Sequence, residues 1–204
     1  MINSDEVTVQ NKSGNPNAYA FRLPHEKHNK ELVNKGDHVK PTISMMFWAG
    51  IWPTGRTSIL SMTRDQTARK KGYSGWSYRK VLGEGLLPHY DGTRVFQQDN
   101  ARIHTSEATM TWLLEYGIEL LDWPPHSPDL SPIENIWSIL KRQLRKKYTH
   151  LQDLKNNEAD RAELQRCVEE VWRAIPQEQI FNCIKSLEKR LRACIRARGW
   201  YTKY

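Results

Sequence analysis

Residues 95–104, VFQQDNARIH, are typical of a short strand that ends in an acid, Asp99. Residues 123–137, WPPHSPDLSPIENIW, are typical of a stiff proline loop that places a second acid, Glu134, on the first turn of a helix. A third candidate acid, Asp5, lies at the start of the chain. Carboxylates brought together from distant stretches suit divalent-cation binding and phosphodiester chemistry.

Each acid also has a purely structural interpretation. Asp99 followed by Asn100 is good turn chemistry after a strand. Ser131 and Glu134 have the spacing of a capping box, in which the glutamate returns to the backbone of the cap residue. Asp5 has the position of an ordinary exposed acid on a terminal strand. The local sequence leaves both interpretations of each acid open.

Two other acids compete for a place in the site, and two histidines flank it. Glu6 follows Asp5 directly and is expected on the opposite face of the strand. Asp129 lies in the proline loop, where a local turn explains it. His104 and His126 stand next to the acid-bearing segments, where each either contacts a phosphate or serves as a structural hydrogen-bonding group.

The 204 residues carry a formal net charge of +8, which favours an anionic partner such as nucleic acid. The sequence contains no run of about 20 apolar residues that could cross a bilayer, and no signal-peptide pattern. Its three cysteines form no Cys-x-x-Cys pair, and His25 and His28 have no partner pair for zinc. We therefore expect an intracellular protein that is not secreted and has neither a membrane partner nor a small-molecule cofactor.

Hydrophobic periodicity predicts an α/β fold, a mixed sheet flanked by helices on both faces. We expect one domain over 1–150, with a long loop at 10–42, and basic C-terminal helices over 151–204 that pack on the same domain. Met110, Leu113 and Leu114 are expected to face the core. The expected strands are 2–9, 44–52, 57–62, 94–98 and 119–123, and the expected helices are 76–90, 105–117, 131–147, 161–174 and 177–197.

The chain resembles the catalytic domain of mariner-like transposases, members of the DDE superfamily with an RNase H-like fold. The resemblance runs from about residue 2 to residue 147 and is carried by SDE at 4–6, QQDNA at 97–101 through His104, and SPDL at 127–130 through PIENIW at 132–137. The 34 residues between Asp99 and Glu134 have the spacing of the Asp-Asp-Glu branch, and FWAG at 47–50 is similar to the family's second strand.

The resemblance implies that Asp5, Asp99 and Glu134 are catalytic and bind metal, with two Mg²⁺ ions that Mn²⁺ can replace. It implies metal-dependent cleavage of DNA at transposon ends and strand transfer into target DNA, and a homodimer on paired ends in which the 10–42 loop reaches the partner. The location is then the nucleus if the source is eukaryotic. Basic side chains and histidines near the acids are the candidate DNA contacts: Arg102, His104, His126, Lys141, Arg142 and Arg145.

One departure from the family gives an alternative. Family members carry helix-turn-helix domains before the catalytic domain, and here almost nothing precedes Asp5. A fragment or a decayed or host-adopted copy is expected on that ground. The alternative function is a catalytically silent remnant that binds DNA non-specifically through its basic helices.

Overall fold

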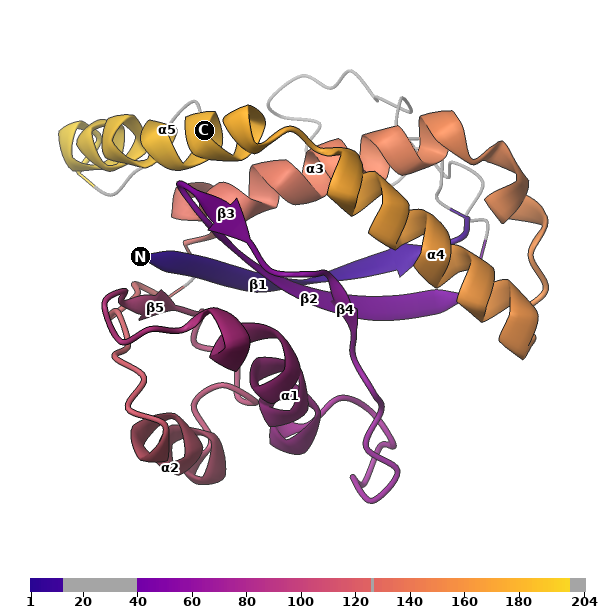
Figure 1. Cartoon of the computed structure of the whole chain (residues 1–204), viewed down its shortest axis with the longest axis horizontal. Coiled ribbons are helices and arrows are strands. Elements are labelled where there is room, and N and C mark those ends of the chain that lie inside the picture. Colours follow the sequence, from indigo (N-terminus) through magenta and orange to yellow (C-terminus); the bar gives the residue numbers. More distant parts are fainter. Residues whose placement is uncertain (13–39, 126, 199–204) are drawn as a thin grey trace, which may run out of the picture.

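A computed structural model describes residues 1–12, 40–125 and 127–198 (Figure 1). The expected loop at 10–42 falls mostly outside these residues, and so does His126. The central sheet has the order β3-β2-β1-β5, and β4 also pairs with β2. Its strands are β1 (Ile2–Gln10), β2 (Ser44–Trp52), β3 (Gly55–Arg56), β4 (Leu60–Ser61) and β5 (Phe96–Gln97).

The two long strands form the backbone of the fold. β1 and β2 pair antiparallel along their whole length, from Asn3 opposite Ile51 to Gln10 opposite Ser44. β5 adds in parallel to the start of β1, with Ile2 opposite Phe96 and Asn3 opposite Gln97. This pairing brings the end of β5 next to Asp5, although 85 residues of chain lie between the two strands.

Helices cover both faces of the sheet, as the sequence predicts for a mixed α/β layer domain (Figure 1). One face carries α1 (Gly75–Val81), which leads into a π-helix (Leu82–Leu86) and a 3₁₀ turn (Leu87–His89), together with α2 (Glu107–Glu115). The other face carries α3 (Pro132–Lys147), α4 (Glu158–Ala174) and α5 (Gln177–Arg196). Short 3₁₀ turns precede and follow α3, at Pro128–Leu130 and Thr149–Asp153.

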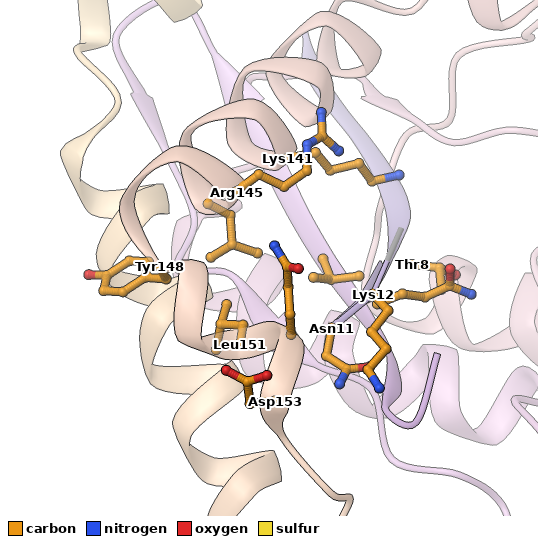
Figure 2. Close-up of a pocket in the computed structure, with 12 residues that line it drawn as sticks. Thr8, Asn11, Lys12, Lys141, Arg145, Tyr148, Leu151 and Asp153 are labelled. Carbon is orange, nitrogen blue, oxygen red and sulfur yellow. The ribbon is translucent and has the colours of Figure 1, made fainter. Parts of the chain in front are cut away.

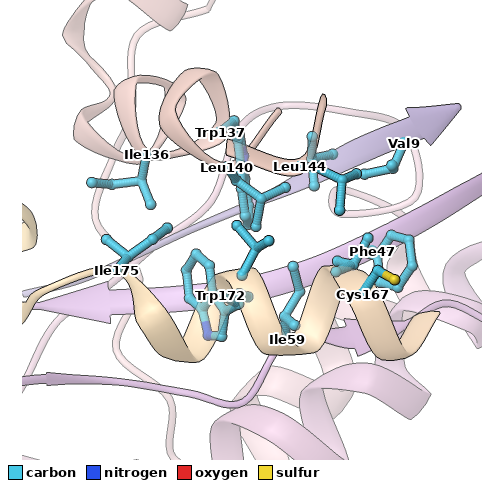
Figure 3. Close-up of a cluster of buried hydrophobic side chains, with 14 of the residues drawn as sticks. Val9, Phe47, Ile59, Ile136, Trp137, Leu140, Leu144, Cys167, Trp172 and Ile175 are labelled. Atoms are coloured by element: carbon cyan, nitrogen blue, oxygen red, sulfur yellow. The ribbon is translucent and has the colours of Figure 1, made fainter. Parts of the chain in front are cut away.

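The core between the sheet and α3–α5 is the larger of two apolar clusters (Figure 3). Trp137 of α3 and Trp172 of α4 lie with ring centroids 5.4 Å apart at its centre. The indole N–H of Trp172 donates to the carbonyl of Thr57, and Arg56 donates to the carbonyls of Trp172 and Ile175. These buried contacts fix α4 and the start of α5 against the β2–β4 side of the sheet.

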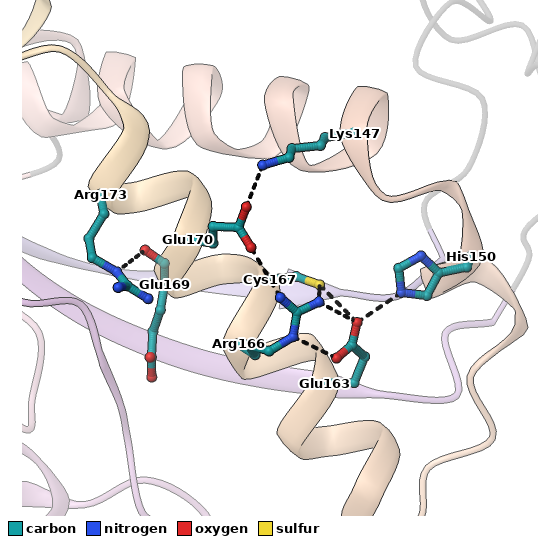
Figure 4. Close-up of polar contacts among 8 residues, drawn as sticks. All are labelled: Lys147, His150, Glu163, Arg166, Cys167, Glu169, Glu170 and Arg173. Carbon is teal, nitrogen blue, oxygen red and sulfur yellow. Dashed lines mark hydrogen bonds and ion pairs between the residues drawn. The ribbon is translucent and has the colours of Figure 1, made fainter.

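Ion pairs join the end of α3 to α4 on the surface (Figure 4). Glu170 accepts from Lys147 and, at 3.0 Å, from Arg166. Glu163 accepts from Arg166 at 2.8 Å and lies 3.0 Å from His150. Exposed pairs of this kind contribute little individually, so the apolar core remains the main support of these helices.

Several predicted boundaries were wrong. Of the expected strand 57–62 only β4, at Leu60–Ser61, is a strand, and β3 lies before it at Gly55–Arg56. Residues 119–123 form only one isolated bridge, between Leu120 and Phe96. The expected helix 76–90 leaves α-geometry after Val81, in a segment that contains Gly83 and Gly85. A side chain at 85 would meet Trp48, since an added Cβ would lie 2.6 Å from the indole ring.

The predicted inward face of α2 was correct only for Leu113, which is buried. Met110 and Leu114 are 41% and 80% exposed. No helix within 1–12, 40–125 or 127–198 is long and apolar enough to span a bilayer.

Candidate metal and nucleic-acid site

β1 places Asp5 against α3. The side chain lies opposite Ala49 of β2, and its Oδ2 accepts a hydrogen bond from the indole N–H of Trp137 at 3.1 Å. Asp5 is therefore not a frayed terminal acid. It is held between the sheet and the first turns of α3.

Asp99 follows directly after β5. Its Oδ1 accepts a hydrogen bond from the backbone N–H of Ala101 at 2.9 Å, the turn contact that its local sequence predicts. The same oxygen lies 2.6 Å from Nδ1 of His104. The side chain is 56% exposed, so the turn holds the carboxylate in a fixed pose that remains open to solvent.

Glu134 lies on the first turn of α3, and the predicted capping box does not form. Ser131 occupies the N-cap position, but within the described residues its hydroxyl makes no capping hydrogen bond and is buried without a partner. Glu134 is therefore free of a capping role. The loop before it is anchored by Arg190 of α5, which donates to the carbonyl of Asp129 at 2.9 Å.

The three acids line one cavity of about 380 Å³. The side-chain amide of Asn100 donates to the carbonyl of Trp123 at 2.8 Å, which connects the loop after β5 to the proline loop. The other lining residues are small or polar, or come from the proline loop: Ser4, Gln97, Ala101, Pro124, Ser127, Pro128 and Ser131. The structure thus brings together three acids from positions that span 130 residues of sequence.

The electrostatics of the cavity favour a cation. Burial raises the pKa of Asp5 from 3.8 to about 8, and the nearby charges of Glu6 and Glu134 add to that effect. Burial also raises the pKa of Glu134, against the opposing charge of Lys141. The hydrogen bond from His104 lowers the pKa of Asp99, so this carboxylate stays ionised. A divalent cation would relieve the repulsion among these acids.

The donor set fits a hard cation such as Mg²⁺, because carboxylate oxygens are its preferred protein ligands. The three acids do not close into one tight cluster: in the described part of the chain, only His150, Glu163 and Cys167 have ligand atoms that all lie within 4.8 Å of one another. That second group is already neutralised by Arg166, which donates to both oxygens of Glu163 (Figure 4). The cavity at Asp5 is the better candidate metal site.

His104 has the geometry of a structural hydrogen-bonding group, the second of its two interpretations from the sequence. The residue is 1% exposed, and its ring nitrogens lie against Asp99 and Glu6. Burial disfavours its charged form, but the hydrogen bonds to the two acids outweigh burial and raise its pKa to about 10. No ring nitrogen is left to meet a phosphate.

A second cavity of about 440 Å³ continues along β1 and α3 (Figure 2). Lys141 and Arg145 reach over it from α3, and Lys12 approaches from the end of β1. Arg102 and Arg142 are exposed, and Arg102 follows Ala101 of the acid-lined cavity. Five of the six candidate DNA contacts lie within the described residues, and four of them are at the surface or in this groove.

Two residues of the site were not predicted. Glu6 was set aside because strand alternation turns it away from Asp5, yet that direction takes it to His104. Trp137 was not among the predicted site residues, whereas its indole N–H donates a hydrogen bond to Asp5. The spacing of Glu134 and Trp137, three residues apart on one helix, was the available signal.

The chain matches known proteins over a region that contains two of the three acids. Residues 57–155 match the family model described as DDE superfamily endonuclease, a range that contains Asp99 and Glu134. The chain is 41% identical over 110 residues to the Tc1 transposase of Caenorhabditis elegans, covering 54% of this chain and 37% of that protein. It is 41% identical over 129 residues to the Tc3 transposase of the same organism, covering 60% and 36%. The chain thus spans little more than a third of the length of these relatives.

Solved structures share the fold, as the sequence predicted. The Mos1 mariner transposase catalytic domain superimposes with a TM-score of 0.55 at 19% identity, covering 78% of this chain and 76% of that one. A pre-cleavage Mos1 transpososome matches with a TM-score of 0.65 at 17% identity, over 99% of this chain and 56% of that one. The mixed sheet with helices on both faces is the RNase H-like fold.

Proposed function

We propose that this chain, which carries a DDE superfamily endonuclease domain homologous to those of the Tc1 and Tc3 transposases, cleaves DNA strands and joins them with the help of divalent cations. One observation carries the proposal. The buried carboxyl of Asp5 shares a cavity with Asp99 and Glu134, and burial together with the nearby charges of Glu6 and Glu134 raises its pKa.

Asp5, Asp99 and Glu134 are the proposed cation ligands, for Mg²⁺ with Mn²⁺ as a substitute, and two ions are expected. Mos1 catalytic-domain structures with Mn and with Mg support this choice of metal. When bound, such ions activate a water or hydroxyl as nucleophile and neutralise charge on the phosphate. The chain's own contribution is to hold the three carboxylates in position. Trp137 holds Asp5, Ala101 and His104 hold Asp99, and the first turn of α3 carries Glu134.

The proposed path of DNA runs from the acid-lined cavity into the groove under Lys141 and Arg145. From Asp5 to Thr8 along β1 and from Glu134 to Lys141 along α3 the advance is about 10 Å in each case. That is roughly three nucleotides of one strand at about 3.4 Å each, so phosphates near the scissile one would reach the groove. Arg102 and Arg142 extend the basic surface.

A homodimer on paired DNA ends is also proposed, because the Mos1 relatives are described as paired-end and strand-transfer complexes. The segment expected to reach the partner, 10–42, lies mostly outside the described residues. Such a protein would work in the nucleus of a eukaryotic source.

The direct test is nicking of a supercoiled plasmid in Mg²⁺ or Mn²⁺, with Asp99→Asn and Glu134→Gln as matched variants. The wild-type chain should nick, and each variant should lose at least about a hundredfold of that rate. Joining of a labelled oligonucleotide 3′-hydroxyl to the plasmid would report strand transfer.

Equal nicking by all three proteins would contradict the assignment. Salt-sensitive binding of unrelated DNA with no cleavage in either metal would instead support the silent DNA-binding remnant.

A further inference from the structure

Asp5 and Glu6 are consecutive residues that serve opposite sides of β1. Asp5 lines the acid-rich cavity on the α3 side. The side chain of Glu6 projects from the other face of the strand, where both of its carboxylate oxygens lie 3.2 Å from Nε2 of His104. Neither Glu6 nor His104 lines the cavity. His104 contacts Asp99, and Glu6 contacts His104, so both residues act on Asp99 without lining the cavity themselves.

His104 is a fixed bridge between the two acids. Its Nδ1 lies 2.6 Å from Oδ1 of Asp99, and its ring packs on Tyr78 with centroids 4.1 Å apart. Tyr78 is itself held, because its hydroxyl donates to Oε1 of Gln98 at 2.8 Å. A buried ring that is packed on one face and bonded at both nitrogens has one orientation.

The two carboxylate oxygens of Asp99 differ in their hydrogen-bond partners. An ionised carboxylate only accepts hydrogen bonds, so His104 donates from one nitrogen to Glu6 and from the other to Asp99. Oδ1 of Asp99 also accepts from the backbone N–H of Ala101. This oxygen therefore has two donors, whereas no hydrogen bond within the described residues engages Oδ2.

We propose that Glu6 and His104 are positioning residues for Asp99. Glu6 orients His104, and His104 donates to Oδ1 of Asp99, which leaves Oδ2 to face a divalent cation. The inference rests on the proposed function, since it assigns Asp99 to cation binding. Partners behind a metal ligand fix its orientation in this way, and their loss typically costs about 10–100-fold in metal affinity.

The test measures Mn²⁺ affinity directly, by electron paramagnetic resonance of the protein without DNA. Glu6→Leu should weaken Mn²⁺ binding by about tenfold or more. Glu6→Gln keeps an acceptor for the ring N–H and should restore most of that loss. His89→Ala is the matched control, because His89 is an exposed histidine that lines neither cavity. Circular dichroism melts establish that each variant is folded.

A second measurement separates positioning from general damage. Glu6→Leu should raise the Mn²⁺ concentration needed for half-maximal nicking and leave DNA affinity in EDTA unchanged. His104→Asn, whose amide can still donate to Asp99, should retain more Mn²⁺ affinity than His104→Leu.

Equal Mn²⁺ affinity in wild type, Glu6→Leu and Glu6→Gln overturns this inference and leaves the proposed function unaffected. Equal loss in both Glu6 variants also overturns it, because charge rather than a hydrogen-bonded pose would then be responsible. Wild-type protein that binds no Mn²⁺ and nicks no DNA contradicts the proposed function, and this inference falls with it.

Discussion

The indole N–H of Trp137 donates to Oδ2 of Asp5 at 3.1 Å, so α3 takes part both in the acid-lined cavity and in the apolar core. Trp137 lies one helical turn after Glu134, so a single face of α3 presents both an acid and a hydrogen-bond donor to β1. The ring of Trp137 is also 2% exposed and packs on Trp172 in the core. The position of Asp5 is thus coupled to the packing of the helices behind it.

Replacement of Trp137 by Phe tests that coupling. The aromatic packing is largely kept, but the donor to Asp5 is lost. Asp5 holds its proton at neutral pH in the metal-free protein, and a hydrogen bond between neutral groups contributes about 0.5–1.5 kcal/mol. We expect a lower free energy of unfolding in urea and weaker Mn²⁺ binding. Trp172→Phe is the matched control: its indole N–H donates to the carbonyl of Thr57, so it should lose stability but keep Mn²⁺ affinity. Unchanged Mn²⁺ binding in Trp137→Phe would argue against the coupling.

Asp5→Asn should make the metal-free protein more stable at neutral pH. Burial raises the pKa of Asp5 from 3.8 to about 8, so the folded state holds a proton that the unfolded chain releases near pH 4. Wild-type stability therefore declines as pH rises from about 4 to 8, and levels off above the folded pKa. The asparagine has no such loss, so the difference between the two proteins should grow over this window.

Thermal melts in EDTA between pH 5 and pH 9 measure that difference. Each kcal/mol recovered by Asp5→Asn should raise Tm by about 2–4 °C in a chain of this size. Excess Mn²⁺ should stabilise the wild type and have a much smaller effect on the variant, because binding to the folded state alone raises stability. A pH-independent difference would contradict the buried-acid explanation.

The sequence predicted the elements that depend on burial along a strand or helix. The apolar run at 44–52 predicted a strand covered on both faces, and β2 has those bounds. The strand predicted at 119–123 was wrong, because an apolar segment forms a strand only where a neighbouring strand from elsewhere in the chain can pair with it. Strand alternation also correctly predicted that Glu6 points away from Asp5, but only the folded structure shows that His104 lies on that side. Local chemistry also favoured a capping box at Ser131, which does not form.

Two serine caps give a direct comparison of a formed and an unformed capping box. Ser74 accepts from the backbone N–H groups of Trp76 and Ser77, and the Ser77 hydroxyl accepts from Ser74 in return. Ser74→Ala should therefore cost about 1 kcal/mol. The buried hydroxyl of Ser131 has no partner in the described residues, so Ser131→Ala loses no hydrogen bond and should not lower stability. Urea denaturation of both variants measures this, and equal losses would mean that Ser131 caps α3 after all.

The groove under α3 predicts how DNA binding responds to salt. If Lys141 and Arg145 each contact a phosphate, the slope of log affinity against log salt should become shallower by about 0.9 for each contact removed. Lys141→Gln with Arg145→Gln should then reduce the slope by about 1.8 and weaken binding of unrelated duplexes alike. Fluorescence anisotropy in EDTA from low to moderate salt measures both quantities without cleavage. Arg69→Gln with Lys70→Gln removes the same charge from exposed residues outside both cavities, and should leave the slope nearly unchanged. Equal changes in the two double variants would mean that net charge, and not the groove, binds the backbone.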